Sequence, residues 1–156
     1  MIRSLLIGAV AGMRALTPFA VVSDAARRSA LPEDSGAPAL LGNPFLSAGA
    51  AALAAGELLG DKLPSAPDRI IAPGLAARLV TGAVAGAALA PRDQRRTAAI
   101  VGAAAAVGAA YLTFHARVRA MRRFGQTSTG LVEDAITAGS AWWIVNRMSP
   151  AHPQEQ

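Results

Sequence analysis

The sequence contains no cysteine, few aromatic residues and little charge. The absence of cysteine excludes disulfide frameworks, cysteine-ligated zinc sites, iron–sulfur clusters and thiol nucleophiles. Aromatic residues make up 4% of the 156 residues and charged residues 16%, below the roughly 25% charged residues of soluble domains. About a quarter of the chain is alanine, so the bulky side chains of a soluble core are scarce. The length suits one domain and argues against a two-domain enzyme.

The chain instead has five apolar runs separated by short polar connections. A membrane-spanning helix needs about 20 apolar residues, and small residues let helices in lipid approach closely. We therefore expect an all-α fold, a polytopic membrane bundle of four to five short Ala/Gly-rich helices. The second and fifth runs are short enough to be re-entrant instead. The runs cover residues 4–22, 44–60, 70–90, 97–116 and 131–145.

The first run also admits a second interpretation, a signal peptide with Arg3 as its basic region and cleavage near Ser23. Arg14 argues against this interpretation because it interrupts the apolar core that a signal peptide requires. We therefore assign residues 1–148 to a single integral membrane domain and residues 149–156 to a polar tail. The expected location is the inner membrane of a bacterium, with several crossings.

The net charge of +5 does not indicate a nucleic-acid partner. Nucleic-acid binders gather their charge on one face, with aromatic or polar side chains between the basic ones. Here the arginines flank apolar runs, as they do at membrane boundaries, so the expected partner is the lipid bilayer. The densest basic group anchors the topology or attracts anionic lipid headgroups, at about 1 kcal/mol per residue. Its members are Arg117, Arg119, Arg122 and Arg123.

Two glycine pairs have the GxxxG spacing that places both glycines on one helix face. We expect these pairs to pack helices within the bundle, with a homodimer interface as the alternative. Both pairs lie in copies of the pentapeptide Gly-Ala-Val-Ala-Gly, and each copy lies upstream of an apolar run that holds an acid. This arrangement predicts a weak internal repeat of the kind seen in inverted-repeat transporters. The glycines are Gly8, Gly12, Gly82 and Gly86.

Charged residues inside or beside the apolar runs are the candidate functional residues. Each Arg, Lys or Asp near a membrane helix centre costs about 2.5 to 3.5 kcal/mol, so such groups must pair, reach the interface or face water. The candidates for a substrate or ion pathway are Arg14, Glu57, Asp61 and Glu133, followed by Lys62, Arg78, His115 and Asp134.

Arg14 lies near the middle of its run, so we expect its side chain to face the interior and meet an acid. Glu57 is the first candidate partner and Glu133 the second. Glu57 and Asp61 are four residues apart and would share one helix face. A fixed buried ion pair that only sets helix register remains the alternative to a pathway.

Little in the sequence indicates an enzyme or a cofactor. The only histidines are His115 and His152, which gives poor support for a metal site. The chain has no GxSxG nucleophile motif and no phosphate-binding P-loop. A membrane-embedded enzyme would have to use Glu133, Asp134 and His115 at one site. We therefore expect a protein that is not an enzyme and holds no cofactor or metal.

Three segments together resemble a family of small uncharacterised bacterial integral membrane proteins, known as a domain of unknown function. They are G-x-R-A-x-x-P at residues 12–18, E-x-x-x-D-K-x-P at 57–64, and the stretch from His115 to Glu133-Asp134. The third segment departs from the family pattern, with Thr129 where a proline is expected. The resemblance covers nearly the whole chain and implies a membrane protein, without implying an activity.

Our leading hypothesis is a transporter or translocase in which the charged candidates line a polar cavity for a small solute, an ion or a lipid headgroup. Pro18 and the Pro73-Gly74 pair would supply the broken helices that such cavities use. The alternative is a non-transporting membrane interaction or assembly subunit whose buried charges are structural ion pairs. A homo-oligomer, formed through the glycine faces, is compatible with either hypothesis.

Overall fold

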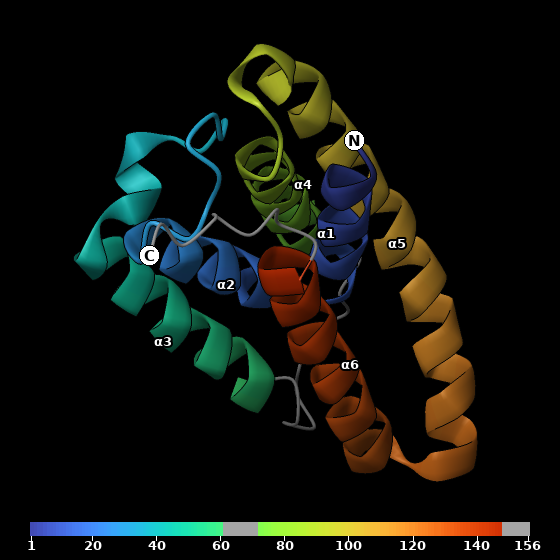
Figure 1. Ribbon diagram of the computed structural model, residues 1–156. Helices are drawn as coiled ribbons and strands as arrows, with labels where there is room; N and C mark the ends of the chain where they lie inside the picture. Colours follow the sequence, from blue (N-terminus) through green and yellow to red (C-terminus); the bar gives the residue numbers. More distant parts are fainter. Residues whose placement is uncertain (61–71, 148–156) are drawn as a thin grey trace.

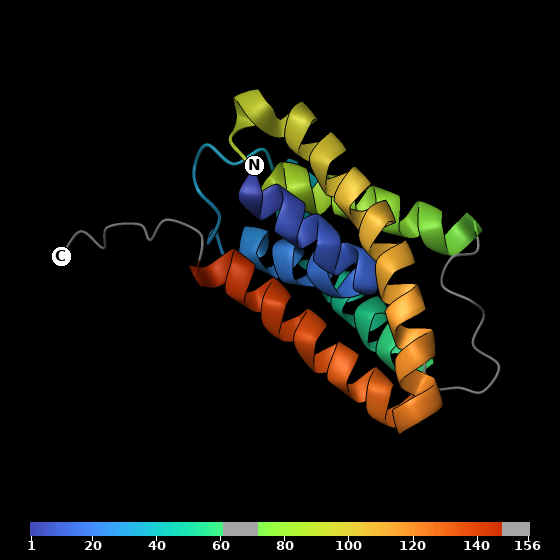
Figure 2. The same ribbon diagram turned by 90° about the vertical axis from the view of Figure 1, so that its right-hand side faces the viewer.

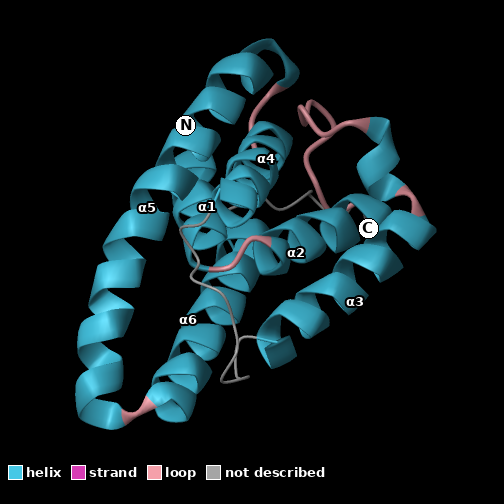
Figure 3. Ribbon diagram, turned by 180° about the vertical axis from the view of Figure 1, so that it is seen from behind, coloured by secondary structure: helices cyan, strands magenta, loops and turns pink. Residues whose placement is uncertain are grey.

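The computed structural model describes residues 1–60 and 72–147, and every regular element in those ranges is helical (Figure 3). The α-helices are α1 (Ile2–Met13), α2 (Leu16–Arg27), α3 (Pro44–Gly60), α4 (Ala72–Ala88), α5 (Arg95–Phe124) and α6 (Gln126–Arg147). Two short 3₁₀ helices, η1 (Ala39–Gly42) and η2 (Arg92–Gln94), lie in the connections.

The all-α class is thus confirmed for the described residues. The expectation of four to five short helices is wrong, because the described ranges already form six α-helices and α5 alone has 30 residues. The predicted tail lies outside the described residues.

The first apolar run forms two helices instead of the single crossing expected from the sequence. Arg14 follows α1 in an extended conformation, with φ −139° and ψ 117°, and α2 begins two residues later. Pro18 lies in the first turn of α2, where its missing N–H is not needed; in a continuous helix it would have removed the hydrogen bond to Arg14. Figure 2 shows α2 turning back toward the edge from which α1 came. Among these three runs the helix break is therefore in the first, because the second lies within α3 and the fifth within α6.

The connections gather at two ends of the bundle. The loops at 28–43 and 89–94 meet at one end, which we call the loop end, where Gly36 N–H donates to Ala90 O (2.7 Å) and Arg92 N–H to Asp34 O (2.8 Å). At the opposite end, the turn end, α5 meets α6 through Gly125, whose φ of 82° favours glycine. Figures 1 and 2 show α5 and α6 meeting there and diverging toward the loop end. Helices α5 and α6 run between the two ends, whereas α1 packs on the loop-end half of α5, with Gly8 facing Gly102 and Gly12 facing Ala106.

Small residues hold α1 and α4 against α5, in a contact that we call the glycine seam. A Cβ added to Gly8 would lie 2.3 Å from Gly102 O, and one added to Gly82 would lie 2.8 Å from the same atom. Only glycine permits such close backbone approach. The seam consists of Gly8, Gly12, Gly82, Gly86 and Gly102, so both GxxxG pairs pack within one chain, on the same helix.

Several charged side chains lie inside this bundle, and many large apolar side chains lie on its surface. Arg14 is the largest fully buried side chain, whereas Phe45 is 86% exposed and Leu112 74%. Residues Arg92–Phe124 form one helix long and apolar enough to cross a membrane, and only 22% of its most apolar window is buried. The core helix of a soluble protein would bury most of such a window. Three shorter apolar helices accompany it, at residues 2–13, 44–59 and 72–88.

Candidate functional site at the break between α1 and α2

The break places two helix ends in the interior. An arginine donates a hydrogen bond to the first of them, the carboxyl end of α1. The last turn of a helix leaves carbonyl oxygens without partners inside the helix. Arg78, on α4, is 5% exposed, and its Nε donates to Gly12 O at 3.0 Å. Its Nη1 donates to Gly74 O in its own helix at 2.9 Å. A cation at this position also complements the negative end of the α1 dipole.

A carboxylate serves the second helix end. Glu57, in the last turn of α3, accepts hydrogen bonds from Ala15 N–H (3.0 Å, Oε1) and Leu16 N–H (2.9 Å, Oε2). These N–H groups begin α2 and have no partner within that helix. An anion here matches the positive end of the α2 dipole. Glu57 is therefore the cap of α2, supplied by a residue about 40 positions further along the chain.

Arg14, between these two ends, is 1% exposed, as its place in the run predicted. Its Nη1 donates to the backbone carbonyl of Glu57 at 3.3 Å, and its Nη2 forms an ion pair with Asp134 of α6. Asp134, which the sequence did not rank as a partner beside Glu57 and Glu133, thus forms an ion pair with Arg14. The Glu57 carboxylate instead accepts hydrogen bonds from the N–H groups at the start of α2. Glu133 and Asp134 lie about 100° apart around α6, so they face different neighbours.

Glu133 faces α5, where Arg117 Nη1 forms an ion pair with its Oε2 at 2.9 Å. Both side chains are nearly buried, at 9% and 11% exposed. Arg117, which the sequence grouped with the other arginines as a candidate contact for lipid headgroups, is thus nearly buried against this acid. Arg119, Arg122 and Arg123 are exposed.

These groups interact electrostatically, and we call them the ion network; its described members are three arginines and three carboxylates. It joins residues from the α1–α2 break and from α3, α4, α5 and α6. The network consists of Arg14, Glu57, Arg78, Arg117, Glu133 and Asp134. The sequence ranked Arg78 and Asp134 as secondary and placed Arg117 elsewhere. The adjacent acids Glu133 and Asp134 could have indicated these ion pairs in the sequence. Because adjacent residues on a helix point in different directions, the two carboxylates need two separate basic partners.

Three other candidates have no observed place in the network. His115 is exposed on α5, and its ring contacts Phe114 edge-on at 5.6 Å between centroids. Asp61 and Lys62 lie outside the described residues. Within the described ranges, no three His, Cys, Asp or Glu side chains are grouped so that they could hold a metal ion.

Two open cavities lie beside the network, between α1, α5 and α6. The smaller, about 190 Å³, is lined by Arg117 and Glu133 together with apolar side chains such as Val132 and Ile136. The larger, about 370 Å³, lies between α1 and α6 and is almost wholly apolar. Met13 lines both, so the two cavities adjoin. The larger, apolar cavity therefore adjoins the smaller one, which contains the nearly buried Arg117–Glu133 ion pair.

A family model described as a domain of unknown function, DUF4126, matches residues 2–146. The chain belongs to the DUF4126 family. A search of curated proteins and a search of solved structures found no match to this DUF4126 member. The family match confirms the resemblance to an uncharacterised family, and it includes every residue of the ion network. It assigns no activity to DUF4126, so a function has to be argued from the site.

Proposed function

We propose that this DUF4126 member is a multi-pass protein of the inner membrane, with α3 to α6 crossing and the α1–α2 pair re-entrant. The lengths support this arrangement: α3 and α4, with 17 residues each, span about 25 Å, and α6, with 22, spans about 33 Å. A hydrocarbon core is about 30 Å thick. The apolar exterior and the charged interior fit lipid as the surrounding solvent.

Within that membrane, the proposed activity is the movement of a small anionic solute, an ion or a lipid headgroup through the ion network. The observation that carries the proposal is the α1–α2 break, because discontinuous helices with charged partners form the binding sites of many transporters. Arg14 would hold the anion. Glu133, which faces a cavity, is a better carrier of a coupling proton than Glu57, whose oxygens accept two helix N–H groups.

A second candidate is a non-transporting interaction or assembly subunit. The observation in its favour is that each charged side chain of the network already meets an opposite charge or a helix end. In that case the ion pairs set the packing of the helices, and no substrate replaces them.

Flux through purified protein in liposomes tests the first candidate. Two probes are used: uptake of radiolabelled phosphate, and dithionite reduction of inner-leaflet phosphatidylglycerol that carries a nitrobenzoxadiazole-labelled headgroup. We expect the wild type to raise at least one rate tenfold or more over protein-free liposomes. If neither rate rises, transport of these anions is wrong.

A double variant separates pathway from packing. Replacing Arg14 and Asp134 together with apolar residues, as in Arg14→Met/Asp134→Leu, removes a buried pair without leaving a lone charge, a change that proteins often tolerate. We expect this variant to insert and to lose the flux. Arg96→Ala, which removes an exposed arginine of α5, is the control and should keep the flux. Wild-type flux in the double variant would instead support the second candidate.

A further inference from the structure

The two adjoining cavities form a lateral groove that runs along α6 from Thr129 to Trp143. The fourteen helical steps from Thr129 to Trp143 correspond to about 21 Å, which exceeds the roughly 15 Å that one leaflet contributes to the hydrocarbon core. The groove is open, and its lining changes along its length. Near Trp143 it is apolar, whereas near the turn end it contains the Arg117–Glu133 ion pair.

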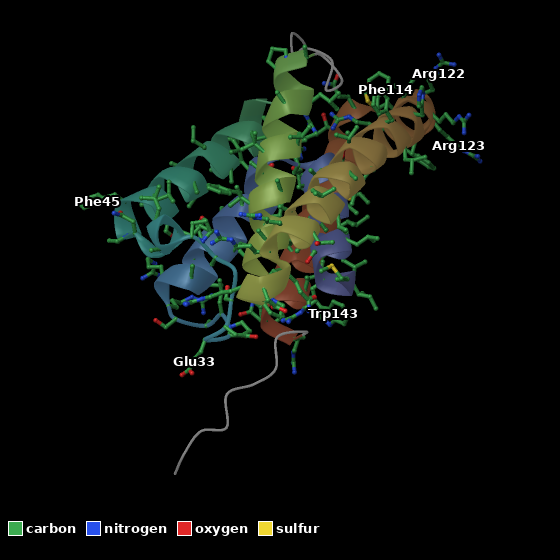
Figure 4. The ribbon with its side chains drawn as sticks, turned by 90° about the horizontal axis from the view of Figure 1, so that it is seen from above. Glu33, Phe45, Phe114, Arg122, Arg123 and Trp143 are labelled. Carbon is green, nitrogen blue, oxygen red and sulfur yellow. The ribbon has the colours of Figure 1, made fainter. Side chains whose placement is uncertain are left out.

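Further positive charge lies at the turn-end mouth of this groove. Arg123 follows the lining residues Ala116 and Ala120 by seven and three positions, so it lies on the same helix face. Arg122 lies about 180° around the helix from the lining residue Thr113, on the other face. Figure 4 shows both arginines at the end of α5, with Trp143 toward the opposite end of the molecule.

This combination matches an amphiphile with one negatively charged end. An apolar groove beside lipid fits an acyl chain. A guanidinium has five N–H donors, and Arg117 directs one to the Glu133 carboxylate and one to the Met121 sulfur. Because Glu133 neutralises Arg117, the excess positive charge of the mouth comes from Arg123.

We propose that the lateral groove binds an anionic phospholipid, with its phosphate at Arg117 and Arg123 and one acyl chain running past Met13 to Trp143. The inference rests on the proposed membrane location, and it deepens the proposed function by naming an anionic lipid as the ligand. Lipid binding without flux would support the lipid site and contradict transport. Phosphate flux without a lipid preference would support transport and contradict the lipid site.

The tryptophans give a direct test, because Trp143 lines the groove while the equally exposed Trp142 does not. Each is studied alone, in Trp142→Phe and Trp143→Phe, in phosphatidylcholine liposomes. A small fraction of the lipid carries bromine near the ends of its acyl chains and quenches nearby tryptophan. We expect brominated phosphatidylglycerol to quench Trp143 at least threefold more than brominated phosphatidylcholine, and the two lipids to quench Trp142 equally.

Charge variants in the Trp142→Phe background locate the headgroup. Arg123→Gln, at an exposed position that need not affect folding, should reduce the preference for phosphatidylglycerol by half or more. Arg117→Gln/Glu133→Gln, which removes the buried pair as a neutral change, should do the same. Arg122→Gln makes the same change in net charge on the other face and should keep the preference. Equal quenching of Trp143 by both lipids, or an equal loss in Arg122→Gln and Arg123→Gln, would overturn the proposal.

Discussion

The glycine seam and the ion network hold the same short helix, α1, by opposite means. Along its length α1 packs through Gly8 and Gly12, which have no side chains, against the backbone of α5. At its end it is held by Arg78 on Gly12 O and by the contacts of Arg14. The seam therefore fixes how close the helices are, and the network fixes where the chain breaks.

The two regions also differ in what a small change does to them. The seam depends on space, because its glycines leave no room for a side chain, and in the proposed membrane location apolar helices rely on close packing. The network depends on charge balance, because removing one partner leaves a buried charge behind. A substitution that removes a charge but keeps the side-chain volume should destabilise the network. A substitution that adds volume without changing charge should destabilise the seam.

The largest effect is expected from Asp134→Asn, which keeps the shape of the side chain and leaves Arg14 facing a neutral amide. Breaking a buried ion pair in this way lowers the free energy of unfolding by about 3–5 kcal/mol. Unfolding by sodium dodecyl sulfate, followed by circular dichroism in mild detergent, measures it. Asp24→Asn is the control, because Asp24 pairs with Arg27 and Arg28 on the exposed end of α2; it should change the value by about 0.5 kcal/mol or less. Equal values for the two variants would show that the network contributes no more than a surface pair.

An intermediate effect is expected at the seam from Gly102→Ala. Its Cβ would lie 2.3 Å from Gly82 O, so α4 and α5 must separate. Overpacking of this kind lowers the free energy of unfolding by about 1–3 kcal/mol. Gly108→Ala, on the same helix with open space around its Cβ, is the matched control and should gain up to about 1 kcal/mol from helix propensity. The same detergent unfolding measures both, and a neutral Gly102→Ala would mean that the helices can move apart freely.

The smallest effect is expected from Glu57→Gln, which removes the charge of the α2 cap and keeps one acceptor oxygen. Loss of a helix cap lowers stability by about 1 kcal/mol. The change should be local, with faster hydrogen exchange of the Ala15 and Leu16 amides, whose N–H groups the carboxylate accepts. Glu33→Gln, in the exposed loop at the loop end, is the control. Unchanged exchange at those two amides would show that the charge of Glu57 does not hold α2.

The parts of this architecture that follow from local spacing could be predicted from the sequence. GxxxG spacing predicted two helix faces for close approach, and the seam uses both. A charge halfway along an apolar run cannot reach water, and Arg14 is buried accordingly. The predicted internal repeat stays a prediction: α1 and α4 share the motif and the partner helix, but their lengths of 12 and 17 residues differ.

The parts that depend on tertiary contacts could not be predicted. Pro18 fits both a kinked helix and the first turn of a new one, and the outcome depends on Glu57 being close enough to cap α2. Adjacent acids at 133 and 134 give no indication of which faces which neighbour until α6 has packed. Arg117 continues a basic run in the sequence, and only the position of Glu133 across from it explains its burial.

The ion pair between Arg14 and Asp134 joins residues 120 positions apart and thereby gives the protein an order of assembly. Ribosomes add about 5–20 residues per second, so Asp134 is synthesised roughly 6 to 24 s after Arg14. During that interval the first two helices exist without the carboxylate that meets Arg14, and in the proposed membrane location this makes their entry into lipid unfavourable. Helix α6 thus supplies the carboxylate that α1 and α2 require. In the proposed membrane location, a chain cut before α6 should leave the α1–α2 hairpin accessible to protease at the membrane surface.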